Sequence, residues 1–271
     1  MSQQITEAFV QQFADNFRHL AQQMQSRFEP HVSIEANIVG MSKSVNRLGQ
    51  RTAQRRTQRH ADTPINDQPH STRYVDLFDW DDGDMIDDQD KIRMLVDPTS
   101  DYVKAMISSL NRAKDDVIIA SMGGNSRATT GNIILPTTQK IAVGGTGLTK
   151  AKIIQARKMF RKNEADNHNG EELFISYSAQ AAADILADPT LTSADYLAGK
   201  FLQEGDVEGK WMGFNWVPSE RTPYDGATRR LYAWAKSGVT LGKGADITTK
   251  VGEDPGKGFN VRVYAKMSVG A

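Results

Sequence analysis

Few residues in this chain are placed to carry out acid–base, nucleophilic or metal chemistry. The chain has no cysteine, which removes thiolate nucleophiles and cysteine-bound zinc. Its histidines share no spacing typical of metal ligands: they are His19, His31, His60, His70 and His168. No Gly-x-Ser-x-Gly motif marks a nucleophilic serine. The sequence predicts no cofactor and no catalytic residues; a hydrolase stays open as a class, but we can name no site for one.

A glycine-rich segment at residues 144–150 precedes a predicted helix, where a phosphate-binding loop would lie. Such a loop needs glycine directly before its lysine and serine or threonine directly after it. Here Thr149 precedes Lys150 and Ala151 follows it, so the motif fails. The sequence instead predicts a flexible turn in which Thr149 caps the helix.

The strongest pattern in the sequence is a separation of charge. Lys+Arg and Asp+Glu both number 33, so the formal net charge is zero. One block contains arginines, with no acid between its first residue and Asp62: Arg47, Arg51, Arg55, Arg56 and Arg59. A block of aspartates follows between Arg73 and Lys91: Asp76, Asp79, Asp81, Asp82, Asp84, Asp87, Asp88 and Asp90. Within one chain the blocks could pair or stay solvated, whereas between copies they favour head-to-tail contact.

The two blocks also suggest two other uses, a cation site for the aspartates and phosphate binding for the arginines. The aspartates do not fit an EF-hand, because placing Gly83 at the glycine position puts Gln89 where glutamate is required, but a looser hydrated cation site stays open. The arginines could bind phosphates without sequence preference, although no aromatic residue lies among them to stack on bases. A sequence-independent nucleic-acid-binding protein is therefore an alternative function.

The elements that must position the blocks are predicted from hydrophobic periodicity. Residues 5–28 predict an amphipathic helix that ends before Pro30. Its apolar stripe is expected to pack either on the core of its own chain or on a partner. Residues 47–71 contain almost no apolar side chains, which predicts disorder or a long excursion from the globule. Further helices are predicted at 98–122, 149–163 and 179–186, and strands at 32–39, 173–177, 212–216, 231–241 and 259–269.

The predicted class is mixed α+β. No apolar run has the length needed to cross a bilayer, and the N-terminus lacks the pattern of a secretory signal. We therefore expect a soluble protein without a membrane partner.

Four separated segments resemble, in the same order, major capsid proteins of tailed bacteriophages: 87–124, 144–160, 208–221 and 247–271. The resemblance covers most of residues 72–271. It implies the Hong Kong 97-type capsid fold, in which a peripheral domain carries a long spine helix. The implied segments are an N-terminal arm with the first strand (1–43), an extended loop (44–86), the peripheral domain (87–172), an axial domain (173–222, approximate) and return strands of the peripheral domain (223–271).

The resemblance implies a major capsid protein, not an enzyme, that assembles into the icosahedral shell around a phage double-stranded DNA genome. It would be made in the host bacterial cytoplasm and reside in the virion. Its implied partners are copies of itself in pentamers and hexamers, a portal protein, a cement or decoration protein, nonspecifically held DNA and, because nothing precedes the arm, a separate scaffolding protein. An encapsulin-like nanocompartment shell, which shares the fold, is an alternative.

Some members of this family join subunits through a lysine in the extended loop and an asparagine next door. No lysine occurs here between Lys43 and Lys91, so we expect noncovalent contacts. The candidate contact residues are the five arginines of the positive block, Asp79, Asp81, Asp82, Asp84, Asp87 and Asp88 of the negative block, and Phe9, Phe13 and Phe17 of the arm.

Overall fold

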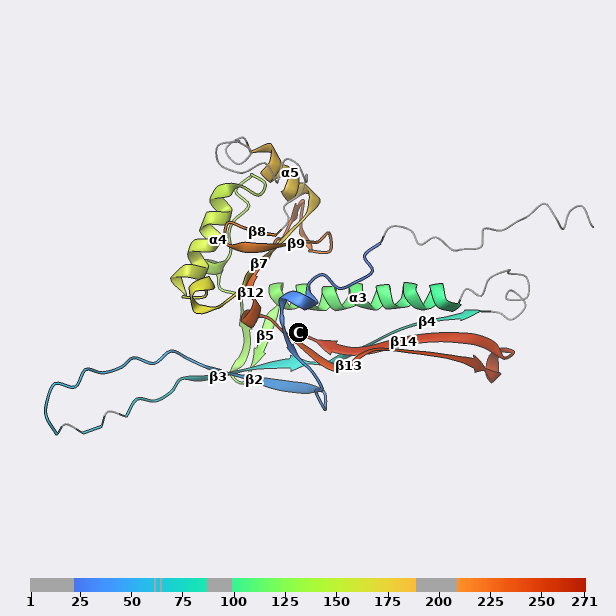
Figure 1. Ribbon diagram of the computed structural model, residues 1–271, viewed down its shortest axis with the longest axis horizontal. Helices are drawn as coiled ribbons and strands as arrows, with labels where there is room; N and C mark the ends of the chain where they lie inside the picture. The colour runs from blue at the N-terminus through green and yellow to red at the C-terminus, as the bar shows by residue number, and fades with distance from the viewer. Residues whose placement is uncertain (1–21, 61, 64, 87–98, 189–208) are drawn as a thin grey trace, which may run out of the picture. The chain divides into compact units, whose positions relative to one another are not determined.

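The structure is a computed structural model that describes residues 22–60, 62–63, 65–86, 99–188 and 209–271 (Figure 1). These residues form two compact units. The described part of unit 1 contains residues 22–26, 79–86, 99–114 and 245–268. The remaining described residues form unit 2. Three elements begin in one unit and end in the other: α3 (Thr99–Gly123), β13 (Thr240–Asp254) and β14 (Asn260–Gly270).

Unit 1 is built on the alternation that the C-terminal sequence predicts. In β14, Val263, Ala265 and Met267 are buried, while Arg262 and Lys266 are exposed. A short turn, η5 (Pro255–Lys257), joins β13 to β14 in the long red hairpin of Figure 1. The sheet to which both strands belong has the order β1-β13-β14-β4, with β4 at Phe78–Ile86. Strand β1 (Ser33–Glu35) belongs to unit 2, where it pairs with residues 240–242 at the start of β13.

Helix α3 confirms the predicted long helix and ends at the predicted glycine pair, Gly123–Gly124. In unit 1 its buried face includes Met106 and Leu110. Lys114 on this helix is also buried, and its Nζ lies 3.4 Å from Oδ1 of Asp246 in β13. This ion pair places the helix against the sheet of unit 1.

Unit 2 contains an antiparallel sheet of order β2-β3-β5-β6. Its strands are β2 (Ser42–Leu48), β3 (His70–Asp76), β5 (Asn125–Ala128) and β6 (Gly131–Ile134). Strands β2 and β3 pair along their whole length, from Ser42↔Asp76 to Leu48↔His70. The pair Arg73↔Ala128 joins this hairpin to the β5–β6 hairpin. The chain between β2 and β3 is therefore an excursion from one end of an ordered sheet.

The second sheet of unit 2 has the order β12-β7-β9-β8 and packs with helices α4 and α5. The bounds are α4 Lys150–Lys162, β7 Leu173–Tyr177, α5 Ala179–Ala187, β8 Lys210–Trp211, β9 Phe214–Pro218 and β12 Ala233–Ala235. All five residues of β7 are buried, as expected for a central strand. One apolar core joins Ile153, Phe214 and Trp216 to β7 and α5. The smaller elements are η1 (Glu29–His31), η2 (Thr137–Gln139), η3 (Asn167–Asn169), β10 (Tyr224–Asp225), β11 (Thr228–Arg229) and η4 (Lys236–Gly238).

The prediction for the N-terminal helix is wrong in its described part. Residues 22–28 contain no helix, and Pro30 lies within η1. The backbone N–H groups of Arg27 and Phe28 instead donate to the Asp115 carboxylate, at 3.0 and 3.2 Å. These tertiary hydrogen bonds replace the helical ones. Residues 5–21 of the predicted helix lie outside the described residues.

Four strand predictions also need correction, three of them because a turn interrupts the alternation. The predicted strand 212–216 begins only at Phe214, since Met212 and Gly213 form a tight turn with positive φ. The predicted strand 231–241 is broken by η4 into β12 and the start of β13. Phe259 precedes β14 in a left-handed conformation and is exposed. The predicted strand 32–39 shortens to β1.

Candidate interaction surfaces

Within the implied extended loop (44–86), the stretch that leaves the sheet of unit 2 is residues 49–69, where the β2–β3 ladder ends; the name extended loop is used for this stretch from here on. Gly49 N donates to Pro69 O at 2.8 Å, just beyond the Leu48↔His70 pair. Within unit 2 the two arms of the loop run out from these strands (Figure 1, blue and cyan). Every residue from 51 to 60 is exposed, and Ile65 is 92% exposed. The described chain therefore does not cover this loop, which matches the predicted excursion.

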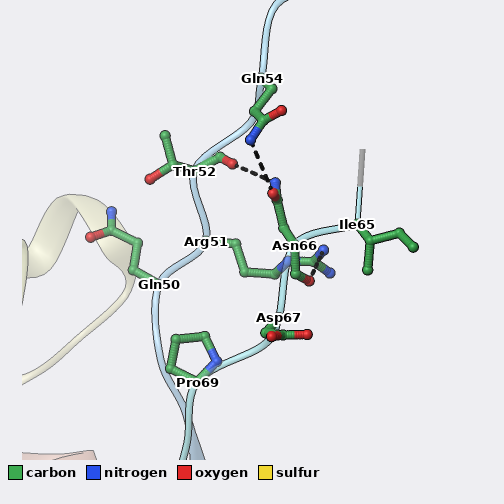
Figure 2. Close-up of a pocket in the computed structure, with 8 residues that line it drawn as sticks. All are labelled: Gln50, Arg51, Thr52, Gln54, Ile65, Asn66, Asp67 and Pro69. Carbon is green, nitrogen blue, oxygen red and sulfur yellow. Dashed lines mark hydrogen bonds between the residues drawn. The ribbon is translucent and has the colours of Figure 1, made fainter. Parts of the chain in front are cut away.

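Side-chain amides tie the two arms of the loop together near its base (Figure 2). Asn66 Nδ2 donates to Thr52 O at 3.1 Å, and its Oδ1 accepts from Gln54 Nε2 at 3.2 Å. The Arg51 guanidinium donates to Asn66 O at 3.0 Å, and Gln68 Nε2 donates to Gly49 O at 2.6 Å. These contacts border an open concavity of polar lining. They hold the arms together without a β ladder.

The arginines of the positive block lie on this loop and on the strand that leads to it. Arg47 is in β2, and Arg51, Arg55, Arg56 and Arg59 are in the loop. The hydrogen bonds that these side chains donate go to backbone carbonyls, as from Arg51 and from Arg56 Nε to Gln58 O at 3.1 Å. In the part of the chain that the structure describes, none of the five forms an ion pair. Among the described residues, their charge is therefore not neutralised by an ion pair.

The described aspartates of the negative block form an exposed strand in unit 1. Asp79, Asp81, Asp82 and Asp84 belong to β4, which is an edge strand of its sheet. Tyr264 on the neighbouring strand β14 donates a hydrogen bond of 3.5 Å to Asp81. Asp76 differs, because it precedes β4 in β3 and pairs with Arg127 of unit 2 at 2.7 Å. The structure thus separates Asp76 from the acidic strand. Asp87 and Asp88 lie outside the described residues.

The aromatic contacts predicted for the N-terminal arm are only partly described. Phe9, Phe13 and Phe17 lie outside the described residues. Phe28 is fully buried in unit 2, where its ring centroid lies 5.5 Å from that of Trp234. The buried acceptor Asp115, which fixes the backbone at Phe28, was missed by sequence reasoning. Its signal was an acidic residue three and four positions before the buried Ile118 and Ile119, and so on their face of α3.

The glycine-rich turn before α4 has the wrong polarity for a phosphate. Lys152 Nζ donates to three backbone carbonyls, those of Val143, Thr146 and Gly147, at 2.7, 2.6 and 2.7 Å. The turn therefore surrounds a cation of its own chain with oxygens, whereas a phosphate loop presents N–H groups. Thr149 is the N-cap residue, but its side chain makes no capping hydrogen bond, which corrects that detail of the prediction.

Of the described histidines, His31 packs against an aromatic ring, whereas His60 and His70 are exposed. Among the described residues, no three His, Asp or Glu side chains are grouped to hold a metal ion. His31 stacks on Phe174 with centroids 4.7 Å apart, and burial, reinforced by Lys236, lowers its pKa below 6.5 against the opposing effect of Glu172. Within the same described ranges, no helix has the length and apolarity to span a membrane.

The chain is similar to known proteins over nearly its whole length. The sequence model of the phage capsid protein family matches residues 5–271. No curated protein matches the sequence. Three solved structures illustrate the similarity of fold, starting with the capsid of cyanophage P-SCSP1u, which has a TM-score of 0.69, 19% identity and coverage of 98% of this chain and 90% of its own.

A chain of Mycobacterium phage Che8 has a TM-score of 0.70, 18% identity and coverage of 97% and 92% of the two chains. The capsid of a native GTA particle has a TM-score of 0.69, 14% identity and coverage of 97% and 91%. At these identities the similarity establishes the fold, which is the mixed α+β, Hong Kong 97-type fold that the resemblance implied.

Proposed function

The chain belongs to the phage capsid protein family and is a structural protein of the virion shell, and from this premise we propose that the extended loop of one subunit lies on strand β4 of a neighbour. The proposal rests on one observation, which is that the chain exposes two surfaces of opposite charge. Arginines without ion pairs in the described chain occupy a loop that leaves its sheet, and carboxylates occupy an edge strand. Complementary surfaces of this kind fix the register and orientation of neighbouring subunits.

Each of these contacts is weak by itself. An exposed ion pair contributes about 0–1 kcal/mol and is screened by salt. In a closed symmetric shell every subunit repeats the contact, so the sum holds the shell while a misplaced subunit still dissociates. A phosphate backbone also suits exposed arginines, so DNA binding by isolated subunits is the competing use of the same loop.

We further propose the subunit's partners. Copies of the chain form pentamers and hexamers, a separate scaffolding protein directs assembly, and a portal protein occupies one vertex. Packaged DNA is held nonspecifically, and a cement or decoration protein is a further candidate. The absence of lysine between Lys43 and Lys91 supports noncovalent joining by the loop.

We also propose that the axial domain is centred on residues 173–222. Strand β7, helix α5 and strand β9 within this range share one apolar core. The same core includes Ile153 of α4 and Ala235 of β12, so the proposed domain extends to both elements. The remaining boundaries are proposed as the resemblance implies them.

The contact is tested by reversing the charge of the loop arginines and then also that of the β4 aspartates. Changing Arg55, Arg56 and Arg59 to Glu should abolish shell formation seen by electron microscopy and leave the circular dichroism spectrum of the monomer unchanged. Adding Asp79→Lys, Asp81→Lys and Asp84→Lys should restore shells, because the complementarity returns with opposite sign. The control changes three exposed cations of α4, Lys158, Arg161 and Lys162, to Glu and should assemble. Normal shells from the loop variant would refute the contact.

A further inference from the structure

The sheet β2-β3-β5-β6 has an open edge at each end, and these edges fit one another. All neighbouring strands in this sheet pair antiparallel. Strands β2 and β6, which form the edges, therefore run in opposite directions. If a second copy is placed beside the first in the same orientation, its β2 lies antiparallel to β6 of the first copy. The alternation of strand directions then continues from one sheet into the next.

Strand β6 lacks the features by which proteins protect an edge strand. All four of its residues are exposed, with Ile133 at 39% and Ile134 at 62%. The strand, Gly-Asn-Ile-Ile, has no charged residue and no proline. An apolar edge of this kind is a template for pairing with another chain unless it is covered.

The register of the sheet places apolar side chains of both edges on the same face. Val75, which is buried, pairs with Lys43, so Val45 shares its face. Ala128 pairs with Arg73 on that face, and Ile133, paired with Ser126, follows the same alternation. With Gly131 of one copy opposite Val45 of the next, Ile133 lies opposite Lys43 and diagonal to Val45 on this same face, where the two β-branched side chains are neighbours across the junction.

We propose that β6 of one subunit pairs antiparallel with residues Ser42–Val45 of β2 in the neighbouring subunit, extending one sheet from copy to copy. The proposal rests on the shell-forming function, and it uses a surface separate from the charge contact of the extended loop. A head-to-tail contact of this kind closes into rings, as pentamers and hexamers require. Pairing of β6 with another β6 would be two-fold and would stop at dimers.

Cysteine cross-linking tests the pairing without background, because the chain has no cysteine. The test variant combines Ser44→Cys with Asn132→Cys, two exposed polar positions on the other face of the edge strands. Within one chain the two edges lie about 14 Å apart, three strand spacings. A disulfide needs Cα atoms within about 7 Å, so each one formed must join two copies.

Oxidised shells of the double variant should give a ladder that reaches pentamers and hexamers on a non-reducing gel. Each single variant should stay monomeric. Two further double variants combine Asn132→Cys with Ser42→Cys or with Asn46→Cys. They test registers shifted by two residues in either direction, with both cysteines on the same face. The pairing would be overturned if all three double variants formed shells whose chains stayed monomeric on the gel. It would also be overturned if Asn132→Cys alone gave dimers. Either result would leave the proposed function intact. If the wild-type chain forms no shells under the same conditions, the proposed function fails and the pairing falls with it.

Discussion

At the scale of single residues, Asp115 determines how the chain reaches the core of unit 2. Its carboxylate is fully buried and accepts from the N–H groups of Arg27 and Phe28. Removing a buried acceptor leaves each donor without its partner, at a cost of about 1–3 kcal/mol per group. Asp115→Ala should therefore lower the free energy of unfolding by about 3 kcal/mol, measured by urea denaturation.

The matched control is the adjacent Asp116→Ala. Asp116 forms an ion pair with Arg221 in a partly exposed position, so its loss should cost no more than about 1 kcal/mol. Equal losses from the two variants would contradict the assigned role of Asp115. This residue could be noticed in the sequence as an acid on an apolar stripe, but its partners lie 87 and 88 residues away and carry no local signal.

His31 gives unit 2 a pH dependence with a definite sign. Because burial and the charge of Lys236 lower its pKa below 6.5, protonation is harder in the folded chain than in the unfolded one. The stability it contributes is complete above pH 6.5 and is lost as pH falls through the lowered pKa.

Urea denaturation between about pH 8 and about pH 5 measures this effect. His31→Gln should reduce the loss of stability on acidification, and Lys236→Gln should reduce it by less, because that cation is the smaller cause. A His31→Gln variant as acid-sensitive as the wild-type chain would contradict the assignment.

At the scale of elements, two glycines of the long β13–β14 hairpin should respond differently to replacement by alanine. A Cβ added to Gly270 in β14 would overlap the backbone carbonyl of Asp76, which cannot move as a side chain can. Gly270→Ala should therefore lower the melting temperature, with a loss of about 3 kcal/mol or more. The control is Gly252→Ala in β13, where nothing lies within 4 Å and the stability should change by less than about 1 kcal/mol. Equal tolerance at both positions would show that β14 does not approach Asp76 this closely.

Periodic elements could be predicted from the sequence, and elements without a buried face could not. Helix α3 and strand β14 follow clear 3.6- and two-residue patterns, and the structure confirms them. Strand β4 was missed because eight of its nine residues are at least partly exposed and aspartate hides the alternation. Strand β13 was missed in most of its length because its sequence contains three glycines and few apolar residues.

For the candidate surfaces, the sequence showed both charge blocks but did not separate the in-chain partner Asp76 from the exposed β4 residues.

At the scale of the whole molecule, the shell should be held without covalent bonds between subunits. The loop lacks the lysine needed for an isopeptide bond, since none occurs between Lys43 and Lys91. Shells of the wild-type chain, dissolved in denaturing detergent under reducing conditions, should therefore run as single chains of 30.0 kDa on a gel. A ladder of covalent multimers from these shells would contradict this expectation.

The central claim, that this chain builds a closed shell, is tested most directly by negative-stain electron microscopy of the purified protein with sedimentation velocity alongside. We expect closed or partial polyhedral shells, or rings of pentamers and hexamers, formed by the chain alone or with its scaffolding protein. A chain that remains a compact monomer at every concentration, with scaffolding protein supplied, would contradict the claim.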